Sequence, residues 1–284
     1  MNGYPSYPIW TDARRTHKAT LTPFIAEGAT TAIVVCPGGS YFWLDENGEG
    51  IEVGQWLQAQ GISAFVLHYS VPGWWAWSTH YRYFFRGCQH PDMYNDGQQA
   101  LTWVHHHAAQ YGINPSQIGI MGFSAGGHLA MHEACTQGTY RPAFVAAIYP
   151  VVTMKGPHAH RRSRRGLMGE WRQYNTKMRD ELSLEQNIPD NCPPVFIANC
   201  VDDPVVDYRN SELLDKALTQ HGIPHKYIQY QEGRHGFGVS ELRGSPECRQ
   251  WKYEFIQWLR NETHIITPTQ KAVCMKYCLA LLSL

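Results

Sequence analysis

Gln117-Ile118-Gly119-Ile120-Met121-Gly122-Phe123-Ser124-Ala125-Gly126-Gly127-His128 is the stretch from which the fold can be inferred. It begins with an apolar run typical of a strand, and the residues after it are compatible with a helix. Between the two lies Gly-x-Ser-x-Gly, centred on Ser124. A nucleophile on a sharp strand-to-helix turn needs neighbours without a Cβ atom, and the helix would direct its free N–H groups toward a developing anion. The alternative is an ordinary Gly/Ser-rich turn, but the strand before it and the helix after it favour the nucleophile.

The length and composition of the chain limit the fold class and the partners. A chain of 284 residues with 43% apolar residues suits a single large α/β domain spanning 1–284. Lys plus Arg and Asp plus Glu both number 24, so the formal charge is zero. This balance argues against nucleic acid or an anionic membrane as the main partner, since both need a basic surplus. No apolar run reaches the ~18 residues that would span a membrane.

The expected location is cytoplasmic. Residues 1–10 are polar and lack the basic start and apolar core of a secretory signal. The eight cysteines lack the spacing of a disulfide framework, and we interpret them as reduced, mostly buried thiols. A secreted or periplasmic location is the alternative if a leader has been removed.

Apolar runs of strand length alternate with helical patterns along the chain. Strands are expected over 30–36 and 62–69, with a helix over 52–60 between them. A later helix is expected to begin with Asp96 as its N-cap. This alternation predicts a mostly parallel sheet covered by helices on both faces. Further strands are expected over 143–152, 194–200 and 225–230, and further helices over 211–219 and 251–259.

Two segments interrupt the pattern within a core of about 30–260. Residues 71–90 are rich in Trp, Tyr and Phe without a clean period, and residues 153–190 are polar, basic and irregular. We interpret both as insertions near the sheet edge. The tail 262–284 ends in an apolar pattern at helical spacing over 271–284, which predicts a short docking helix or, as the alternative, a disordered end.

Four candidate site elements follow four different strands. The carboxyl ends of parallel strands lie at one edge of a sheet, so Gly38-Gly39, Ser124, Asp203 and His235 are expected to converge there. A serine hydroxyl needs a base within hydrogen-bond reach, and histidine has a suitable pKa. That histidine needs a carboxylate on its far nitrogen. Asp202 is the alternative to Asp203.

Other histidines are weaker candidates for the base. The adjacent residues 105–107 point about 100° apart around a helix and cannot converge on one atom. His128 and His132 lie on the helix behind Ser124 and are interpreted as packing or hydrogen-bonding residues. His235 is flanked by glycines in a loop after a strand, where a mobile base belongs.

The motifs in combination resemble those of α/β-hydrolase carbohydrate esterases. The similarity covers about 30–260 and is greatest to the acetylxylan-esterase-like group, near the hormone-sensitive-lipase-like and prolyl-oligopeptidase-like serine hydrolases. The motifs are Cys36-Pro37-Gly38-Gly39-Ser40-Tyr41, Gly122-Phe123-Ser124-Ala125-Gly126-Gly127-His128, Asp202-Asp203-Pro204-Val205-Val206 and Gly233-Arg234-His235-Gly236-Phe237-Gly238.

The resemblance implies an α/β-hydrolase fold with cap or lid insertions and assigns roles within the site. It selects Asp203, three residues before Val206, as the triad acid. The oxyanion donors would be the backbone N–H of Gly39 or Ser40 together with that of Ala125. The chain departs from the lipase-like relatives, which have His-Gly-Gly-Gly where it has 37–40 as Pro-Gly-Gly-Ser.

The implied reaction is hydrolysis of an acetyl ester on a sugar, such as an acetylated xylan oligosaccharide, by a Ser-His-Asp acyl-enzyme route. No metal or organic cofactor is implied. The expected partner is a small-molecule or oligosaccharide ester, and a homo-oligomer is left open. Two alternatives are a serine peptidase of the prolyl-oligopeptidase type and a non-catalytic binding protein on the same scaffold.

Candidate substrate contacts are Tyr41, Trp74, Trp75 and Arg161. The aromatic rings of the 74–85 cluster could stack on sugar rings, or they could pack as a lid over the site. Arg161 belongs to a basic run, 160–165, that could bind a uronate carboxylate. The alternative for this run is a solvated helix face paired with local acids such as Glu170 and Asp180.

Overall fold

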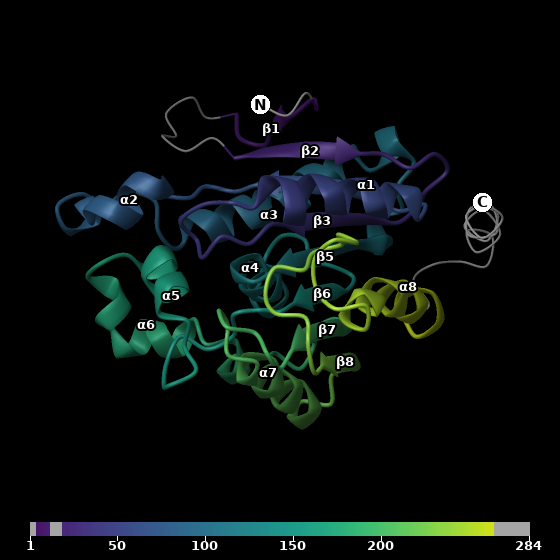
Figure 1. Cartoon of the computed structure of the whole chain (residues 1–284). Coiled ribbons are helices and arrows are strands. Elements are labelled where there is room, and N and C mark those ends of the chain that lie inside the picture. The colour runs from purple at the N-terminus through teal and green to yellow at the C-terminus, as the bar shows by residue number, and fades with distance from the viewer. Residues whose placement is uncertain (1–3, 12–18, 264–284) are drawn as a thin grey trace.

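The computed structural model describes residues 4–11 and 19–263, and the helix expected over 271–284 lies outside them. Its strands form one sheet in the order β1-β2-β4-β3-β5-β6-β7-β8 (Figure 1). The strands are β1 (Tyr7–Pro8), β2 (Thr20–Phe24), β3 (Ala32–Cys36), β4 (Ser63–His68), β5 (Ile118–Phe123), β6 (Val145–Ile148), β7 (Val195–Cys200) and β8 (His225–Tyr230).

The sheet is parallel from β4 through β8, as the sequence predicted. β2 extends it beyond β4 by antiparallel pairing, and β1 pairs antiparallel with β2. The expected core start near residue 30 is therefore too late, because Leu21 in β2 is fully buried. β2 is short and contains a proline, so its strand pattern in the sequence is weak.

Successive residues of each central strand face opposite sides of the sheet and enter different cores. In β3, Val34 belongs to the core that includes α3, α4 and α7, whereas Ile33 and Val35 belong to the core that includes α1 and α8. The helices are α1 (Glu52–Ala59), α2 (Gly73–Thr79), α3 (Asp92–His107), α4 (Ala125–Cys135), α5 (Arg161–Met168), α6 (Thr176–Glu181), α7 (Arg209–Gln220) and α8 (Trp251–Asn261).

The two insertions are more regular than the sequence indicated. Residues 71–90 contain α2, and residues 153–190 contain α5 and α6, which lie together to the left of the sheet in Figure 1. α3 begins at Asp92, so the prediction of Asp96 as its N-cap is wrong. Asp96 is buried within the helix, where its carboxylate accepts hydrogen bonds from Trp10 Nε1 at 2.7 Å and Ser70 N at 2.8 Å.

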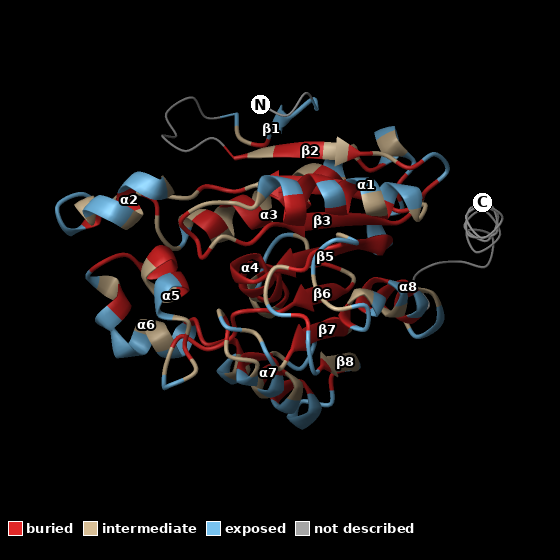
Figure 2. Ribbon diagram, viewed as in Figure 1, coloured by how far each residue is buried: buried red, intermediate tan, exposed pale blue. Residues whose placement is uncertain are grey.

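Figure 2 shows the central strands buried, whereas α2 and α6 carry much exposed surface. Across residues 4–11 and 19–263, no helix has both the length and the apolar character needed to cross a bilayer. Six of the cysteines lie in this part of the chain and are free thiols, and five of them are buried. The predicted location of the protein stays a prediction.

Candidate active site

Ser124 occupies the turn between β5 and α4, with φ 53° and ψ −118°. The glycines of the pattern are required by close backbone contacts. A Cβ on Gly122 would lie 2.0 Å from the carbonyl oxygen of Gly126, and a Cβ on Gly126 would lie 2.0 Å from that of Cys36. Any side chain at either position would force β3, β5 and α4 apart, and Ser124 would lose its position.

The structure brings Ser124, His235 and Asp203 into one hydrogen-bonded chain. Ser124 Oγ lies 3.0 Å from His235 Nε2, and His235 Nδ1 lies 2.6 Å from Asp203 Oδ2. The Asp203 side chain is only 1% exposed, and that of His235 is 14% exposed. This is the arrangement in which a histidine can take the serine proton while a carboxylate fixes its tautomer.

Asp203 and Asp202 have different partners, although they are adjacent. Asp203 Oδ1 accepts hydrogen bonds from the backbone N–H of Val205 at 2.8 Å and Val206 at 3.0 Å, which leaves Oδ2 for His235. Asp202 Oδ1 instead accepts from the backbone N–H of Arg234 at 2.7 Å. Asp202 therefore holds the loop that carries His235, and Asp203 contacts the histidine itself.

The loop after β3 reaches Ser124 from the other side. Gly39, Ser40 and Tyr41 have φ of 136°, 56° and 60°. A Cβ on Gly38 would lie 2.9 Å from Ser124 Cβ, so this loop passes directly against the serine. Ala125 begins α4, where first-turn N–H groups have no intrahelical acceptor. The predicted role of the Gly39, Ser40 and Ala125 N–H groups as oxyanion donors stays a prediction.

Glu49 is a site residue that the sequence analysis missed. It is 4% exposed and lies in a π-helical turn, Glu46–Ile51. Its Oε2 accepts from Gly38 N at 2.7 Å, and its Oε1 accepts from Tyr149 Oη at 2.8 Å. The Tyr149 ring lies 4.7 Å from that of His235, and its Oη accepts from Gly238 N at 3.1 Å. One carboxylate thus connects the loop after β3 with the loop that carries His235.

Burial raises the pKa of Glu49, while the nearby His235 and the hydrogen bonds from Tyr149 and Gly38 act to lower it. No sequence motif marks Glu49, because its role in connecting the two loops depends on partners from other parts of the chain.

A second missed group comes from the start of α5. Arg162 Nε donates to Ser40 Oγ at 2.9 Å, and its guanidinium lies 5.4 Å from the centre of the Trp43 ring. Burial lowers the pKa of His160 to about 4, with smaller contributions from Arg162 and His235. His160 and Arg162 therefore belong to the surroundings of the triad, and His160 stays neutral there.

Two of the predicted substrate contacts require correction. Tyr41 is fully buried, and its hydroxyl lies 2.8 Å from His128 Nδ1, so its side chain supports the core and cannot contact the substrate. Arg161 is exposed, but the next residue, Arg162, is the one that contacts the loop beside Ser124. The helical turn of α5 separates the two side chains by about 100°.

Trp74 and Trp75 are not packed as a lid. They are 63% and 70% exposed, respectively. Trp74 contacts Trp43 at 5.6 Å and Trp77 at 4.6 Å between ring centres, so it lies close to the Arg162 side of the site. Contact of either tryptophan with substrate stays a prediction.

The other histidines have structural partners. His128 Nε2 lies 2.8 Å from the carbonyl oxygen of Leu182, as expected for a hydrogen-bonding residue behind Ser124. His105 stacks on Tyr140 and His107 stacks on Trp103, at 4.1 and 3.9 Å between ring centres. These residues do not converge.

Comparison with known proteins identifies the family of the chain. The chain matches the model of the BD-FAE family over residues 23–218. It is 31% identical over 229 residues to an acetylxylan esterase of Xylanibacter ruminicola, covering 78% of this chain and 44% of that protein. It is also 31% identical over 229 residues to endo-1,4-beta-xylanase B of Butyrivibrio fibrisolvens, covering 73% of this chain and 32% of that protein. The chain thus spans less than half the length of each of these relatives.

A solved structure extends the likeness to almost the whole chain. The acetyl ester-xyloside bifunctional hydrolase of Caldicellulosiruptor lactoaceticus superposes with a TM-score of 0.78 at 27% identity. The match covers 90% of this chain and 95% of the other. The predicted α/β-hydrolase fold is confirmed.

Proposed function

Because this chain belongs to the BD-FAE family, we propose that it is a serine esterase that removes acetyl groups from a carbohydrate such as an acetylated xylan oligosaccharide. The observation that carries the proposal is the contact of Ser124 Oγ with His235 Nε2 at 3.0 Å, with Asp203 on the far side of the imidazole at 2.6 Å. The relatives named acetylxylan esterase and acetyl ester-xyloside hydrolase support the choice of ester and sugar.

The reaction proceeds in two halves. Ser124 Oγ attacks the acetyl carbonyl carbon while His235 Nε2 takes the hydroxyl proton, and the carbonyl oxygen becomes an oxyanion. Backbone N–H groups of Gly39 or Ser40 and of Ala125 stabilise that oxyanion, each by about 3 kcal/mol. The intermediate then collapses. The C–O bond to the sugar breaks, and His235 returns the proton to the leaving sugar oxygen.

Water completes the cycle. His235 removes a proton from a water molecule that attacks the acetyl-Ser124 carbonyl carbon, and collapse of the second tetrahedral intermediate releases acetate and restores the serine hydroxyl. Asp203 stays ionised throughout and stabilises the imidazolium. Neither half requires a metal or an organic cofactor.

The test is a substrate panel applied to the wild-type chain and to Ser124→Ala. The panel contains p-nitrophenyl acetate, p-nitrophenyl butyrate, an acetylated xylo-oligosaccharide and a prolyl-amide peptide substrate. We expect acetate release from the first and third substrates, less activity on butyrate, and a loss of at least ~10³-fold in kcat for Ser124→Ala. Circular dichroism of the variant confirms that it is folded.

The other outcomes separate the alternative functions. Cleavage of the prolyl amide without acetate release would identify a peptidase. Lack of turnover with every substrate, by a folded protein, would identify a non-catalytic binding protein. Hydrolysis of p-nitrophenyl acetate with no acetate released from the oligosaccharide would retain the esterase chemistry and reject the carbohydrate substrate.

A further inference from the structure

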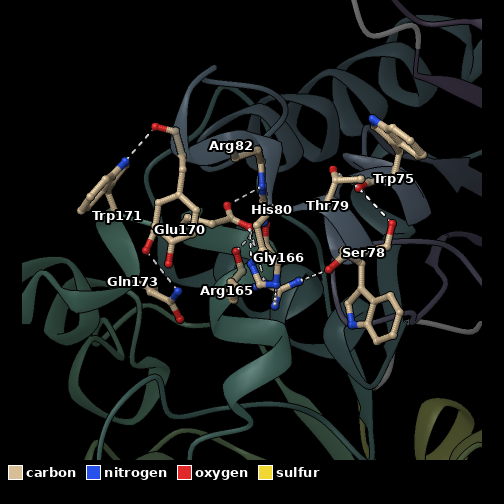
Figure 3. Close-up of polar contacts among 12 residues, drawn as sticks. Trp75, Ser78, Thr79, His80, Arg82, Arg165, Gly166, Glu170, Trp171 and Gln173 are labelled. Carbon is tan, nitrogen blue, oxygen red and sulfur yellow. Dashed lines mark hydrogen bonds and ion pairs between the residues drawn. The ribbon is translucent and has the colours of Figure 1, made fainter.

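A buried ion cluster joins the two insertions beside the site. The Glu170 carboxylate has no exposed surface, and it lies 2.9 Å from Arg82 Nε, 3.6 Å from Arg165 Nε and 3.7 Å from His80 Nδ1. Figure 3 shows these side chains converging from separate segments. Arg82 and His80 come from the first insertion, whereas Arg165 and Glu170 come from the second.

The same arginines bind backbone carbonyl groups across the junction. Arg82 Nη1 donates to Gly166 O in the second insertion at 2.9 Å, and Arg165 Nη2 donates to Trp77 O in the first at 2.7 Å. Each guanidinium therefore fixes the backbone of the opposite insertion. Arg82 Nη1 also donates to Cys88 O within its own insertion, at 2.9 Å. The surface built on this cluster is accordingly held in a defined shape.

That surface carries a pocket of about 220 Å³ with aromatic and cationic walls. Phe84, Phe85 and Trp171 are 85%, 70% and 68% exposed. The Trp171 ring meets the Tyr83 ring edge to face, with 5.0 Å between ring centres. Trp171 Nε1 donates a hydrogen bond to Tyr83 O at 3.0 Å, drawn as the dashed line from Trp171 in Figure 3. We call this site the aromatic pocket. It is lined by Arg82, Tyr83, Phe84, Phe85, Arg86, Gln89, Trp171 and Arg172.

The aromatic pocket has a surplus of positive charge. Arg86 forms a two-point ion pair with Asp92, both contacts at 2.8 Å. Arg172 Nη1 donates to the carbonyl oxygen of His90 at 2.7 Å, and no ion pair joins Arg172 to a carboxylate in the described chain. Burial lowers the pKa of Arg172 and the neighbouring Arg86 lowers it further, while Asp92, which is paired with Arg86, acts to raise it.

A count of charges around the aromatic pocket gives the same result. The pocket and the ion cluster beside it hold four guanidinium groups, those of residues 82, 86, 165 and 172, but only two carboxylates pair with them, those of Glu170 and Asp92, which leaves two positive charges in excess. An anion seated between Arg86 and Arg172 would relieve their mutual repulsion.

We propose that the aromatic pocket binds a uronic-acid residue of a polysaccharide, away from the triad. The flat rings of Phe84, Phe85 and Trp171 suit the C–H faces of sugar rings, and Arg172 supplies a planar donor pair for the carboxylate. Exposed rings without cationic neighbours would suit many apolar partners, but a cationic wall selects an anionic one. The choice of a carbohydrate rests on the proposed function, whereas binding itself does not require Ser124.

The test measures binding of xylo-oligosaccharides by titration calorimetry, with and without a glucuronate branch, to the full chain. We expect the acidic oligosaccharide to bind roughly tenfold more tightly than the neutral one at low salt, and this preference to shrink as salt rises. Arg172→Gln should abolish the preference. Trp171→Ala should weaken both ligands by roughly five- to tenfold.

Matched controls are available on α7 and α8. Arg209→Gln removes a half-exposed arginine and Tyr253→Ala a half-exposed aromatic ring, and neither should change binding. Turnover of p-nitrophenyl acetate should be the same in Arg172→Gln, Trp171→Ala and wild type. If wild type does not hydrolyse p-nitrophenyl acetate, the proposed esterase activity is refuted. If the two pocket variants bind the oligosaccharides as wild type does, the proposed binding at the aromatic pocket is refuted.

Two further outcomes would overturn the proposal. Equal affinity for the acidic and neutral oligosaccharides would show that Arg172 recognises no carboxylate. Sedimentation equilibrium that shows a dimer in wild type and a monomer in Trp171→Ala would assign the aromatic rings to a second copy of the chain.

Discussion

At the scale of single residues, Asp203 and Asp202 provide a direct comparison. Asp203→Asn should lower kcat by roughly 10³–10⁴-fold, because an amide cannot hold His235 in the tautomer that accepts the Ser124 proton. Asp202→Asn should cost less than about tenfold in kcat, since within the described residues the Asp202 carboxylate meets the backbone N–H of Arg234 and not the imidazole of His235. The measurement is kcat on p-nitrophenyl acetate for both variants. An equal loss in the two would reject Asp203 as the acid.

A substitution of Glu49 tests whether the loop after β3 and the loop that carries His235 depend on one carboxylate. Both donors that meet it, Gly38 N–H and Tyr149 O–H, need an acceptor oxygen, and an amide supplies only one. Glu49→Gln should lower kcat by roughly 10–100-fold with little change in KM, because the loop after β3, which holds the predicted oxyanion donors, and His235 lose their common support. Glu52→Gln, at an exposed position in α1, is the control. Unchanged kcat in Glu49→Gln would exclude this role.

Glu49 also has a predictable effect on stability. Since burial raises its pKa in the folded protein, the folded state holds the proton more tightly than the unfolded chain. The contribution of Glu49 to the free energy of unfolding should therefore fall as the pH rises above 4.5, the ordinary value, through the raised pKa. Urea unfolding of wild type and Glu49→Gln between pH 4 and 8 isolates this contribution, because other titrating groups affect both proteins equally. The free energy of unfolding of wild type minus that of Glu49→Gln should fall as the pH rises, and a constant difference would contradict the prediction.

At the scale of elements, the insertions were the part least predictable from sequence. The helix α5 is rich in arginine, and its buried residues are Ser163, Gly166, Leu167 and Met168. The buried positions 163, 166 and 167 have helical spacing, but Ser163 and Gly166 are not apolar enough to reveal it in the sequence, and the guanidinium contacts with carbonyl groups and Glu170 leave no apolar signal. The apolar strands β3 to β7 were predicted correctly because both faces are buried, and continuous apolar runs follow from that.

The ion cluster makes a prediction about the insertions as a unit. Glu170→Gln removes the carboxylate and leaves the buried guanidinium of Arg82 and the partly buried one of Arg165 without their acid, so it should destabilise the protein by about 3–5 kcal/mol. Asp180→Asn, which breaks only the exposed pair with Lys155, should cost less than about 1 kcal/mol. Urea unfolding measures both. Similar losses in the two variants would show that burial does not set the cost.

Arg82 and Arg165 both lie over the Phe42 ring, at 5.0 and 4.8 Å, so the same cluster contacts the segment that directly follows Gly39, Ser40 and Tyr41. The insertions therefore support the site as well as the aromatic pocket.

At the scale of the whole molecule, the sequence located the triad because strand order and motif order agree. Ser124, Asp203 and His235 each follow a parallel strand, so the sheet brings them to one edge without further information. Glu49, Tyr149 and Arg162 could not be found in this way, since their roles depend on side-chain contacts across loops. β2 was missed for a related reason: its burial comes from pairing with β4, to which it is antiparallel.

The whole molecule should also lose stability in mild acid, because three neighbouring histidines, the buried His128 and the partly buried His90 and His132, stay uncharged in the fold. Burial lowers the pKa of His90 and of His128 to about 4 each, and it lowers the pKa of His132 well below its ordinary value. The unfolded chain takes up these protons near pH 6.5, and the folded protein does not. The stabilisation is thus complete above about pH 6.5 and is lost as the pH falls toward the folded pKa values, at about 1.4 kcal/mol per pH unit for each histidine.

His132 is the position at which this can be tested with least damage. It packs against Tyr94 and His90 at 4.8 and 5.5 Å between ring centres, and in the described chain its buried Nδ1 has no hydrogen-bond partner. His132→Phe keeps the ring and removes one titrating group, so the loss of unfolding free energy between pH 7 and pH 5 should shrink by about 2 kcal/mol. His128→Phe removes contacts to Tyr41 and Leu182, so it should be destabilised at both pH values. An unchanged difference between pH 7 and pH 5 in His132→Phe would mean that acid weakens the fold through other groups.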